Sequence, residues 1–122
     1  ETEQREDSMR IAIPVTNGRL AMHFGHCQEF ALVDVETDGD NKGIQKVTMV
    51  PAPEHQPGLL PPWLHEQAAD IIIAGGMGSR AHDLFVQQGM EVIVGAPSME
   101  PQGIVRAYLA SELETGKNVC DH

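Results

Sequence analysis

A chain of 122 residues, of which 41% are hydrophobic, can bury one core without disulfide support. Its formal net charge of -10, with eight Lys and Arg against 18 Asp and Glu, argues against nucleic acid as a partner. No apolar run reaches the roughly 20 residues of a membrane helix and no signal-peptide pattern is present, so we expect a cytoplasmic protein without a membrane partner. We also expect a monomer.

The chain is expected to form one domain with a polar segment at each end. Residues 1–8 carry four acids and one base without apolar periodicity, which indicates a disordered leader or an expression remnant. Residues 9–122 are expected to form a single domain whose tail is mobile from about residue 116.

Five short segments have the apolar or alternating pattern of β-strands. The second and third flank a turn-forming sequence at 38–43 and are therefore expected to form an antiparallel hairpin. The fourth is apolar at nearly every position, as in strands covered on both faces. The predicted strands are residues 10–15, 30–36, 44–50, 70–74 and 90–94.

Three further segments have the apolar spacing of helices. They run from the prolines at 61 and 62 to about residue 68, from a cap at Ser79 to a stop at Gly89, and through apolar positions between Ile104 and Leu113. The element order is therefore β-β-β-α-β-α-β-α. This order predicts an α/β fold with a five-stranded mixed sheet, one strand antiparallel, and helices on its faces.

The predicted topology brings four loops to one edge of the sheet. If the second strand is antiparallel to its neighbours, the other four point the same way, and open α/β sheets bind ligands in the crevice outside such strand ends. We therefore expect ligand binding at this edge. Its loops contain His23, His26 and Cys27 after the first strand, His55 after the third, residues 75–78 after the fourth and residues 95–97 after the fifth.

The sequence MHFGHC places two imidazoles and a thiol around one glycine. His23 and His26 are spaced to share one side of a turn, and Gly25 permits the tight backbone that this requires. Imidazole and thiolate suit copper, zinc or iron, which makes His23, His26 and Cys27 candidate metal ligands. A packed corner is the alternative that spacing leaves open, whereas a closed structural zinc site lacks an evident fourth ligand.

A glycine-rich segment, Gly75-Gly76-Met77-Gly78, connects the fourth predicted strand to the next helix. Its N–H groups, the helix dipole and the charge of Arg80 favour an anionic ligand. The segment is neither a dinucleotide-binding fingerprint nor a phosphate-binding loop with its lysine. Glycines needed only for close packing are an equal alternative.

The sequence does not favour catalysis. Cys27 and His26 are adjacent, a geometry that rarely aligns a ring nitrogen with a thiol, and no third group is evident. The first strand also lacks the carboxylates of a two-metal nuclease. We therefore expect no enzymatic activity and no catalytic residue, and instead a soft, apolar lining from Met22, Met77, Met99 and Phe24.

Several motifs together resemble one protein family. The sequences RIAIPV, HFGHC, PGLLPPWL and DIIIAGGMGSRAHDLF, with a terminal CDH, resemble those of dinitrogenase iron-molybdenum cofactor biosynthesis proteins from residue 9 to residue 122. The resemblance implies a three-layer α/β/α, ribonuclease H-like fold without nuclease activity. It also implies a preformed, anionic metal-sulfur cluster as ligand: a molybdenum-copper sulfide in the most similar members, or the nitrogenase iron-molybdenum cofactor and its precursors in others.

By motif match, the resemblance implies that His23, Phe24, Gly25, His26 and residues 75–80 form the cluster-binding site. Many relatives lack a cysteine beside this motif, which leaves the role of Cys27 open. Two roles agree with the resemblance: a carrier or storage protein for the cluster, or a regulatory domain that works with ATPases of the MinD/Mrp type. A redox or hydrolytic enzyme that uses Cys27 is a third, weaker hypothesis.

Overall fold

The computed structural model describes residues 8–22, 27–38, 41–53 and 58–113. The predicted leader, except for Ser8, and the predicted tail from about residue 116 lie outside these ranges. The elements are β1 (Ser8–Thr16), β2 (Arg19–Leu20), β3 (Glu29–Asp38), β4 (Asn41–Pro51), α1 (Leu60–Glu66), β5 (Ile71–Ile73), α2 (Ser79–Gln87), β6 (Glu91–Ile93) and α3 (Pro101–Leu109).

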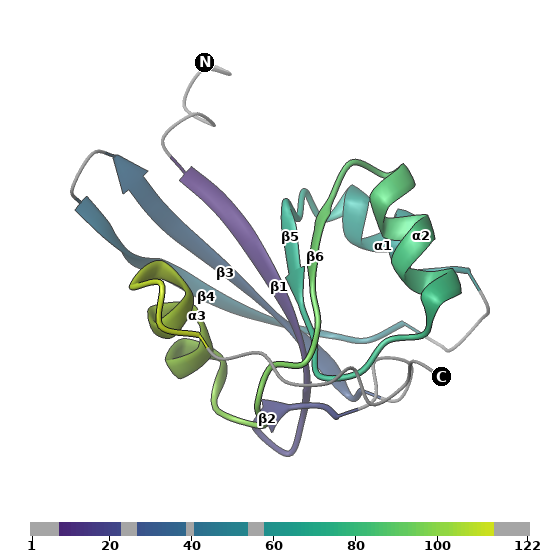
Figure 1. The fold of residues 1–122 in the computed structure, drawn as a ribbon, viewed down its shortest axis with the longest axis horizontal. Coiled ribbons are helices and arrows are strands. Elements are labelled where there is room, and N and C mark those ends of the chain that lie inside the picture. The colour runs from purple at the N-terminus through teal and green to yellow at the C-terminus, as the bar shows by residue number, and fades with distance from the viewer. Residues whose placement is uncertain (1–7, 23–26, 39–40, 54–57, 114–122) are drawn as a thin grey trace.

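The strands form one mixed sheet in the order β4-β3-β1-β5-β6, with β2 paired to the end of β1 (Figure 1). β3 runs antiparallel to β1 and β4, while β5 is parallel to both β1 and β6. β1, β4, β5 and β6 therefore point the same way, which confirms the predicted five-stranded mixed sheet. The additional strand β2 is not predicted, because two residues are too few to show an alternating pattern.

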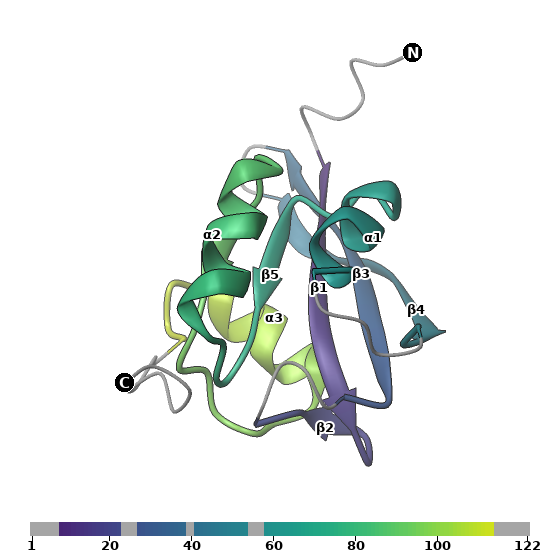
Figure 2. The ribbon, with the colours of Figure 1, turned by 90° about the vertical axis from the view of Figure 1, so that its right-hand side faces the viewer.

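The two faces of the sheet bury alternate side chains of β1, as the two-residue period of a strand requires. Ile13 belongs to a buried cluster with Ile104 of α3. Ala12 belongs to a second cluster, with Leu64 of α1 and Phe85 of α2. Figure 2 views the molecule from the side of α1 and α2, with the sheet behind them and α3 beyond it. The molecule thus has the three-layer α/β/α, ribonuclease H-like architecture that was expected.

Some boundaries differ from prediction because local backbone conformation overrides the apolar pattern. α2 starts at Ser79, but its N-cap is Gly78 in an extended conformation with φ -68° and ψ 156°, so the predicted cap at Ser79 is wrong by one residue. α3 ends before Leu113 because Ser111 has a φ of 60°, in the left-handed region. Leu113 nevertheless packs against the core. Within the described ranges, no helix is long and apolar enough to cross a membrane.

A hydrogen-bonded cluster at the amino-terminal edge of the sheet joins three segments. Arg10 Nε donates to Asp34 Oδ1 at 2.8 Å, and Arg10 Nη2 donates to Asp34 Oδ2 at 3.3 Å. Nη1 donates to the carbonyl oxygen of Gln67 at 2.6 Å, and the Arg10 backbone N–H donates to Asp70 Oδ2 at 2.9 Å. Arg10 thus connects β1, β3 and the segment between α1 and β5, at the edge opposite the one where ligand binding is predicted.

Candidate functional site

The carboxyl ends of β1, β4, β5 and β6 lie along one edge of the sheet, at the bottom of Figure 1. The segments that follow these strands carry the residues predicted to bind the ligand. His23, Phe24, Gly25, His26 and His55 lie outside the described residues. The residues that flank them are described, and these flanks show how the predicted segments are anchored to the sheet.

Gln28 connects the flanks of the two histidine-containing segments. Its backbone N–H donates to the carbonyl oxygen of Val15, at the end of β1, over 2.9 Å. Its carbonyl oxygen accepts a hydrogen bond from the N–H of Ala52 at 3.1 Å. The chain that leaves residues 23–26 and the chain that approaches residues 54–57 are therefore held at neighbouring points on the edge.

On the other side of the histidine segment, β2 is fixed to the loop that follows β6. The Leu20 N–H donates to the Met99 carbonyl oxygen at 2.9 Å, and Ser98 Oγ donates to the Leu20 carbonyl oxygen at 3.0 Å. Arg19 Nη1 donates to the Ser98 carbonyl oxygen at 3.3 Å. The sequence did not predict Ser98 or Arg19 at this site, because no local pattern relates residues 78 or 79 positions apart.

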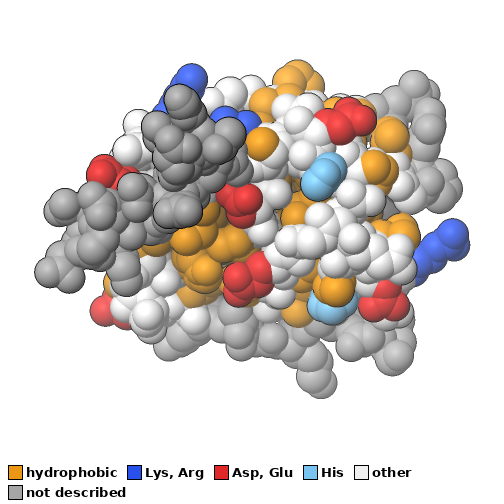
Figure 3. Space-filling model, turned by 90° about the horizontal axis from the view of Figure 1, so that it is seen from above, with side chains coloured by type: hydrophobic (Ala, Val, Ile, Leu, Met, Phe, Trp, Pro, Cys, Tyr) orange, Lys and Arg blue, Asp and Glu red, His pale blue; other side chains and the backbone are white. Residues whose placement is uncertain are grey.

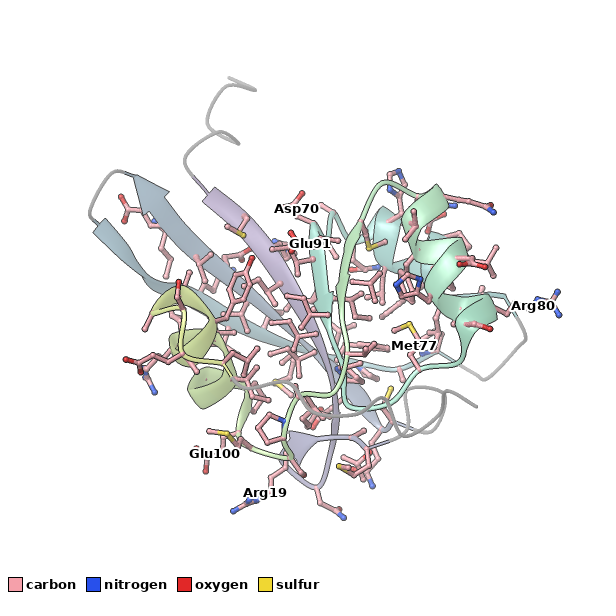
Figure 4. All side chains as sticks on the ribbon, viewed as in Figure 1. Arg19, Asp70, Met77, Arg80, Glu91 and Glu100 are labelled. Carbon is pink, nitrogen blue, oxygen red and sulfur yellow. The ribbon has the colours of Figure 1, made fainter. Side chains whose placement is uncertain are left out.

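The first three residues of the glycine-rich segment are buried. Gly75 accepts a hydrogen bond on its carbonyl oxygen from the N–H of Gly95 at 2.8 Å, which joins the loops that follow β5 and β6. Met77 has 1% of its surface exposed and belongs to the cluster that contains Leu64 and Phe85. Figure 4 shows its side chain directed into the molecule. Met77 therefore packs in the core below the edge.

The glycine-rich segment reaches solvent at Gly78, where α2 begins. No described side chain caps this nine-residue helix, and its first N–H groups carry the partial positive charge of a helix N-terminus. Arg80 is exposed, and its side chain extends outward from α2, away from Met77 (Figure 4). The backbone at the start of α2, more than the Arg80 side chain, therefore makes this end of the edge suitable for an anion.

Cys27 is half-buried and packs against the cluster formed on the α1 and α2 face of the sheet. Burial raises the pKa of the Cys27 thiol to about 11, and hydrogen bonds with the backbone of Cys27 and Val15 offset only part of this effect. The thiol is therefore protonated at neutral pH, whereas a nucleophile must be a thiolate. This environment argues against an enzyme that uses Cys27 as its nucleophile.

The two edges of the sheet carry different charged side chains. Asp70 and Glu91 lie at the amino-terminal edge in Figure 4, and the view onto that edge shows acidic side chains near its centre (Figure 3). Arg19 and Glu100 lie at the opposite, carboxyl-terminal end (Figure 4). Among the described side chains, no three His, Cys, Asp or Glu residues come together as a metal site. The predicted metal ligands His23 and His26 are not among the residues to which this statement applies.

The strand order and the helices on both faces define a small three-layer α/β domain in which β1, β4, β5 and β6 end at one edge of the sheet. Over residues 7–111 the chain matches the dinitrogenase iron-molybdenum cofactor family, and it belongs to that family. This match confirms the family predicted from the sequence motifs. The chain is also 28% identical to the uncharacterized protein MJ0580 of Methanocaldococcus jannaschii over 107 residues, which cover 87% of this chain and 90% of that protein.

Two solved structures have the same fold. The crystal structure of PH0822 aligns with a TM-score of 0.80 and 26% sequence identity, over 90% of this chain and 96% of that chain. The apo form of the orange protein from Desulfovibrio gigas aligns with a TM-score of 0.69 and 18% identity, over 90% of this chain and 94% of that chain. At 18% identity, the similarity to the orange protein shows only that the two proteins share a fold.

Proposed function

We propose that this protein carries or stores a preformed, anionic metal-sulfur cluster, a molybdenum-copper sulfide, and catalyses no reaction. Membership of the dinitrogenase iron-molybdenum cofactor family supports a cluster or its precursor as the ligand. The observation that carries the proposal is the contact between two predicted site segments. Gly75, at the start of the glycine-rich segment, packs directly against the backbone of Ala21 and Met22, which immediately precede His23.

The chemistry of the edge suits such a cluster. A molybdenum-copper sulfide is a soft anion, and the N–H groups at the start of α2 favour negative charge. Imidazole nitrogens are good ligands for copper. We therefore propose His23 and His26 as metal ligands. Segment 75–78 forms the anion-binding side through the exposed backbone at Gly78 and the start of α2, with Arg80 beside it, and Phe24, Gly25 and His55 complete the site.

Cys27 is the weakest of the proposed ligands. Burial raises the pKa of its thiol, and a metal has to displace that proton before a metal-sulfur bond forms. Cys27 also packs against the core, which gives the residue a structural role that does not require a ligand. The proposal therefore rests on the histidines, with Cys27 as a tentative third ligand.

The choice of cluster follows from the resemblance of the HFGHC sequence to the molybdenum-copper orange protein of sulfate-reducing bacteria, whose apo form shares this fold. A carrier of the nitrogenase iron-molybdenum cofactor or its precursor is the alternative that family membership favours. A regulatory domain that works with MinD/Mrp-type ATPases is the second alternative function. In each case we propose a monomeric, cytoplasmic protein.

Anaerobic titration of the apo protein with tetrathiomolybdate and Cu(I) tests the proposal. We expect visible charge-transfer bands that saturate at a fixed ratio and remain with the protein on gel filtration. His23→Ala and His26→Ala should weaken the bands. His65→Ala is the matched control, because His65 is exposed in the last turn of α1, outside the proposed site.

The outcomes separate the hypotheses. Absence of protein-bound bands, or bands that persist unchanged in both His→Ala variants, would contradict the carrier proposal. A stronger response to tetrathiomolybdate with Fe(II) than with Cu(I) would favour the iron-molybdenum alternative. Turnover of an ester or disulfide substrate that disappears in Cys27→Ser would contradict the absence of catalysis.

A further inference from the structure

Gly75 occupies a position where a side chain would be crowded by the neighbouring segment. A Cβ atom on this residue would lie 3.0 Å from Leu20 Cδ2 and 3.3 Å from the carbonyl oxygens of both Ala21 and Met22. The backbone of Gly75 does not have a positive φ, so space, and not conformational freedom, explains the need for glycine. Two of the three obstructing atoms belong to the backbone and cannot move aside by a rotamer change.

The backbone that Gly75 contacts is also fixed from its other sides. Ala21 N–H donates to the Pro14 carbonyl oxygen in β1 at 2.8 Å, and the N–H and carbonyl of Leu20 are bonded to Met99 and Ser98. Residues 20–22 are therefore enclosed between the end of β1, the loop after β5 and the loop after β6.

Gly75 itself is equally constrained. Its carbonyl oxygen accepts from Gly95 N–H, and the preceding carbonyl, of Ala74, accepts from Ala96 N–H at 3.2 Å. These bonds continue the pairing of β5 with β6 beyond the ends of both strands. The segment that carries Gly75 is tied to β6, so we expect an added methyl group at Gly75 to displace residues 20–22 by a few tenths of an ångström.

We propose that Gly75, with Ser98 on the opposite side, is a positioning residue that sets where the chain enters residues 23–26 relative to the start of α2. The inference deepens the proposed function and rests on it for its effect on ligand binding. It assigns the glycine a role different from that of an exposed N–H donor. The absent side chain lets the two halves of the proposed site approach each other.

Gly78 provides a matched control three residues away. A Cβ on Gly78 would meet no atom within 4 Å, and the backbone at φ -68° and ψ 156° is one that alanine adopts readily. If glycine matters at this connection only through flexibility or open N–H groups, Gly75→Ala and Gly78→Ala should behave alike. If spacing matters, only Gly75→Ala should shift the amide signals of residues 20–22.

The test combines ligand affinity with a local structural readout. Tetrathiomolybdate and Cu(I) are titrated into wild type, Gly75→Ala and Gly78→Ala, and amide proton-nitrogen spectra are recorded for each apo protein. We expect Gly75→Ala to shift the amide signals of residues 20–22 and to weaken binding roughly 10- to 100-fold, the range found when groups that orient metal ligands are lost. Gly78→Ala should leave the amide signals of residues 20–22 unchanged, because its added methyl group meets no atom within 4 Å.

Ser98→Ala keeps the proposal testable if Gly75→Ala does not fold. It removes the hydrogen bond to the Leu20 carbonyl without a steric clash, so it should shift the same amide signals and weaken binding in the same direction. A folded Gly75→Ala protein with wild-type affinity and unshifted signals would overturn the inference. Wild type that binds no cluster would instead refute the proposed function, while the amide signals would still decide whether Gly75 and Ser98 position residues 20–22.

Discussion

Met77 is predicted to stabilise the core without contributing its sulfur to the ligand. Its side chain is 1% exposed and lies in the same cluster as Phe30, Leu64 and Phe85. Complete burial of a methionine side chain stabilises a fold by about 1.5–3 kcal/mol, and truncation leaves a cavity that adds to the loss. Met77→Ala should therefore lower the free energy of unfolding by about 2–5 kcal/mol, measured by urea denaturation.

Met77→Leu separates packing from ligand contact. Leucine has nearly the same volume, so the expected loss of stability is below about 1.5 kcal/mol. Because the thioether lies in the core, titration of Met77→Leu with tetrathiomolybdate and Cu(I) should give the wild-type affinity. Met22→Ala is the control for stability: Met22 is 44% exposed, and its truncation should change the unfolding free energy little.

Two results would refute this reasoning. A stable Met77→Leu protein that has lost cluster binding would mean that the sulfur contacts the ligand, as the sequence alone suggested. A Met77→Ala protein that unfolds at the wild-type urea concentration would mean that the side chain is not part of a packed core.

Three further predictions concern described residues elsewhere. The Arg10 guanidinium donates two hydrogen bonds to Asp34, and these should give a coupling free energy of about 1–2 kcal/mol. The measurement is urea unfolding of Arg10→Gln, Asp34→Asn and the double variant, and additive effects on the unfolding free energy would contradict it. Replacing the other cysteine of the chain, Cys120→Ser, leaves Cys27 as the thiol that iodoacetamide can modify. At pH 8 Cys27 should then react roughly a hundredfold more slowly than an unperturbed thiol, because its pKa is raised from 9.0 to about 11. Equal reaction rates would contradict this prediction. Burial raises the pKa of the Cys27 thiol from 9.0 to about 11, so the unfolded chain loses this proton first and stability should fall between about pH 9 and 11. Burial and the charge of Glu91 also raise the pKa of Tyr108 above its usual 10.0, which adds to the fall above about pH 10. Cys27→Ala and Tyr108→Phe should each flatten this fall, and a fall of unchanged slope in both would contradict the assignment.

The sheet was predictable from sequence because its strands either alternate apolar and polar residues or are apolar at nearly every position. The run of three isoleucines, Ile71–Ile73, is buried on both faces as expected, and the antiparallel β3 follows from the hairpin with β4. Boundaries set by single backbone angles were not predictable. Nothing in the apolar pattern around Ser111 indicates a φ of 60°, and the pattern therefore extended α3 too far.

The position of the candidate site was predictable for a topological reason, while the roles of its residues were not. Strands that point the same way place their loops at one edge, and this alone joined the histidine segment to the glycine-rich segment. Gly75 lies between Ala74 and Gly76, and Gly78 lies between Met77 and Ser79; neither pair of neighbours indicates how closely other segments approach the glycine. Only the packing shows that one faces the backbone of Ala21 and the other faces open space. The buried position of Met77 was hidden in the same way, since a methionine between glycines resembles a loop residue.

The proposal that an acidic chain binds an anion requires an explanation, because a formal charge of -10 repels a sulfide cluster. Charges separated by more than about 10 Å are largely screened at moderate salt, so the carboxylates of Asp70 and Glu91 at the far edge matter little at the site. At the near edge, Glu100 lies at the same end as Arg19, and Arg80 extends outward from α2. Among the described residues, side-chain charge therefore gives the proposed site little net attraction. The N–H groups at the start of α2 remain as the source that favours an anion, and they act only on a ligand in contact with them. This is why the distance between the histidine segment and the glycine-rich segment, which Gly75 keeps short, matters more to the proposed function than the charge of the whole chain.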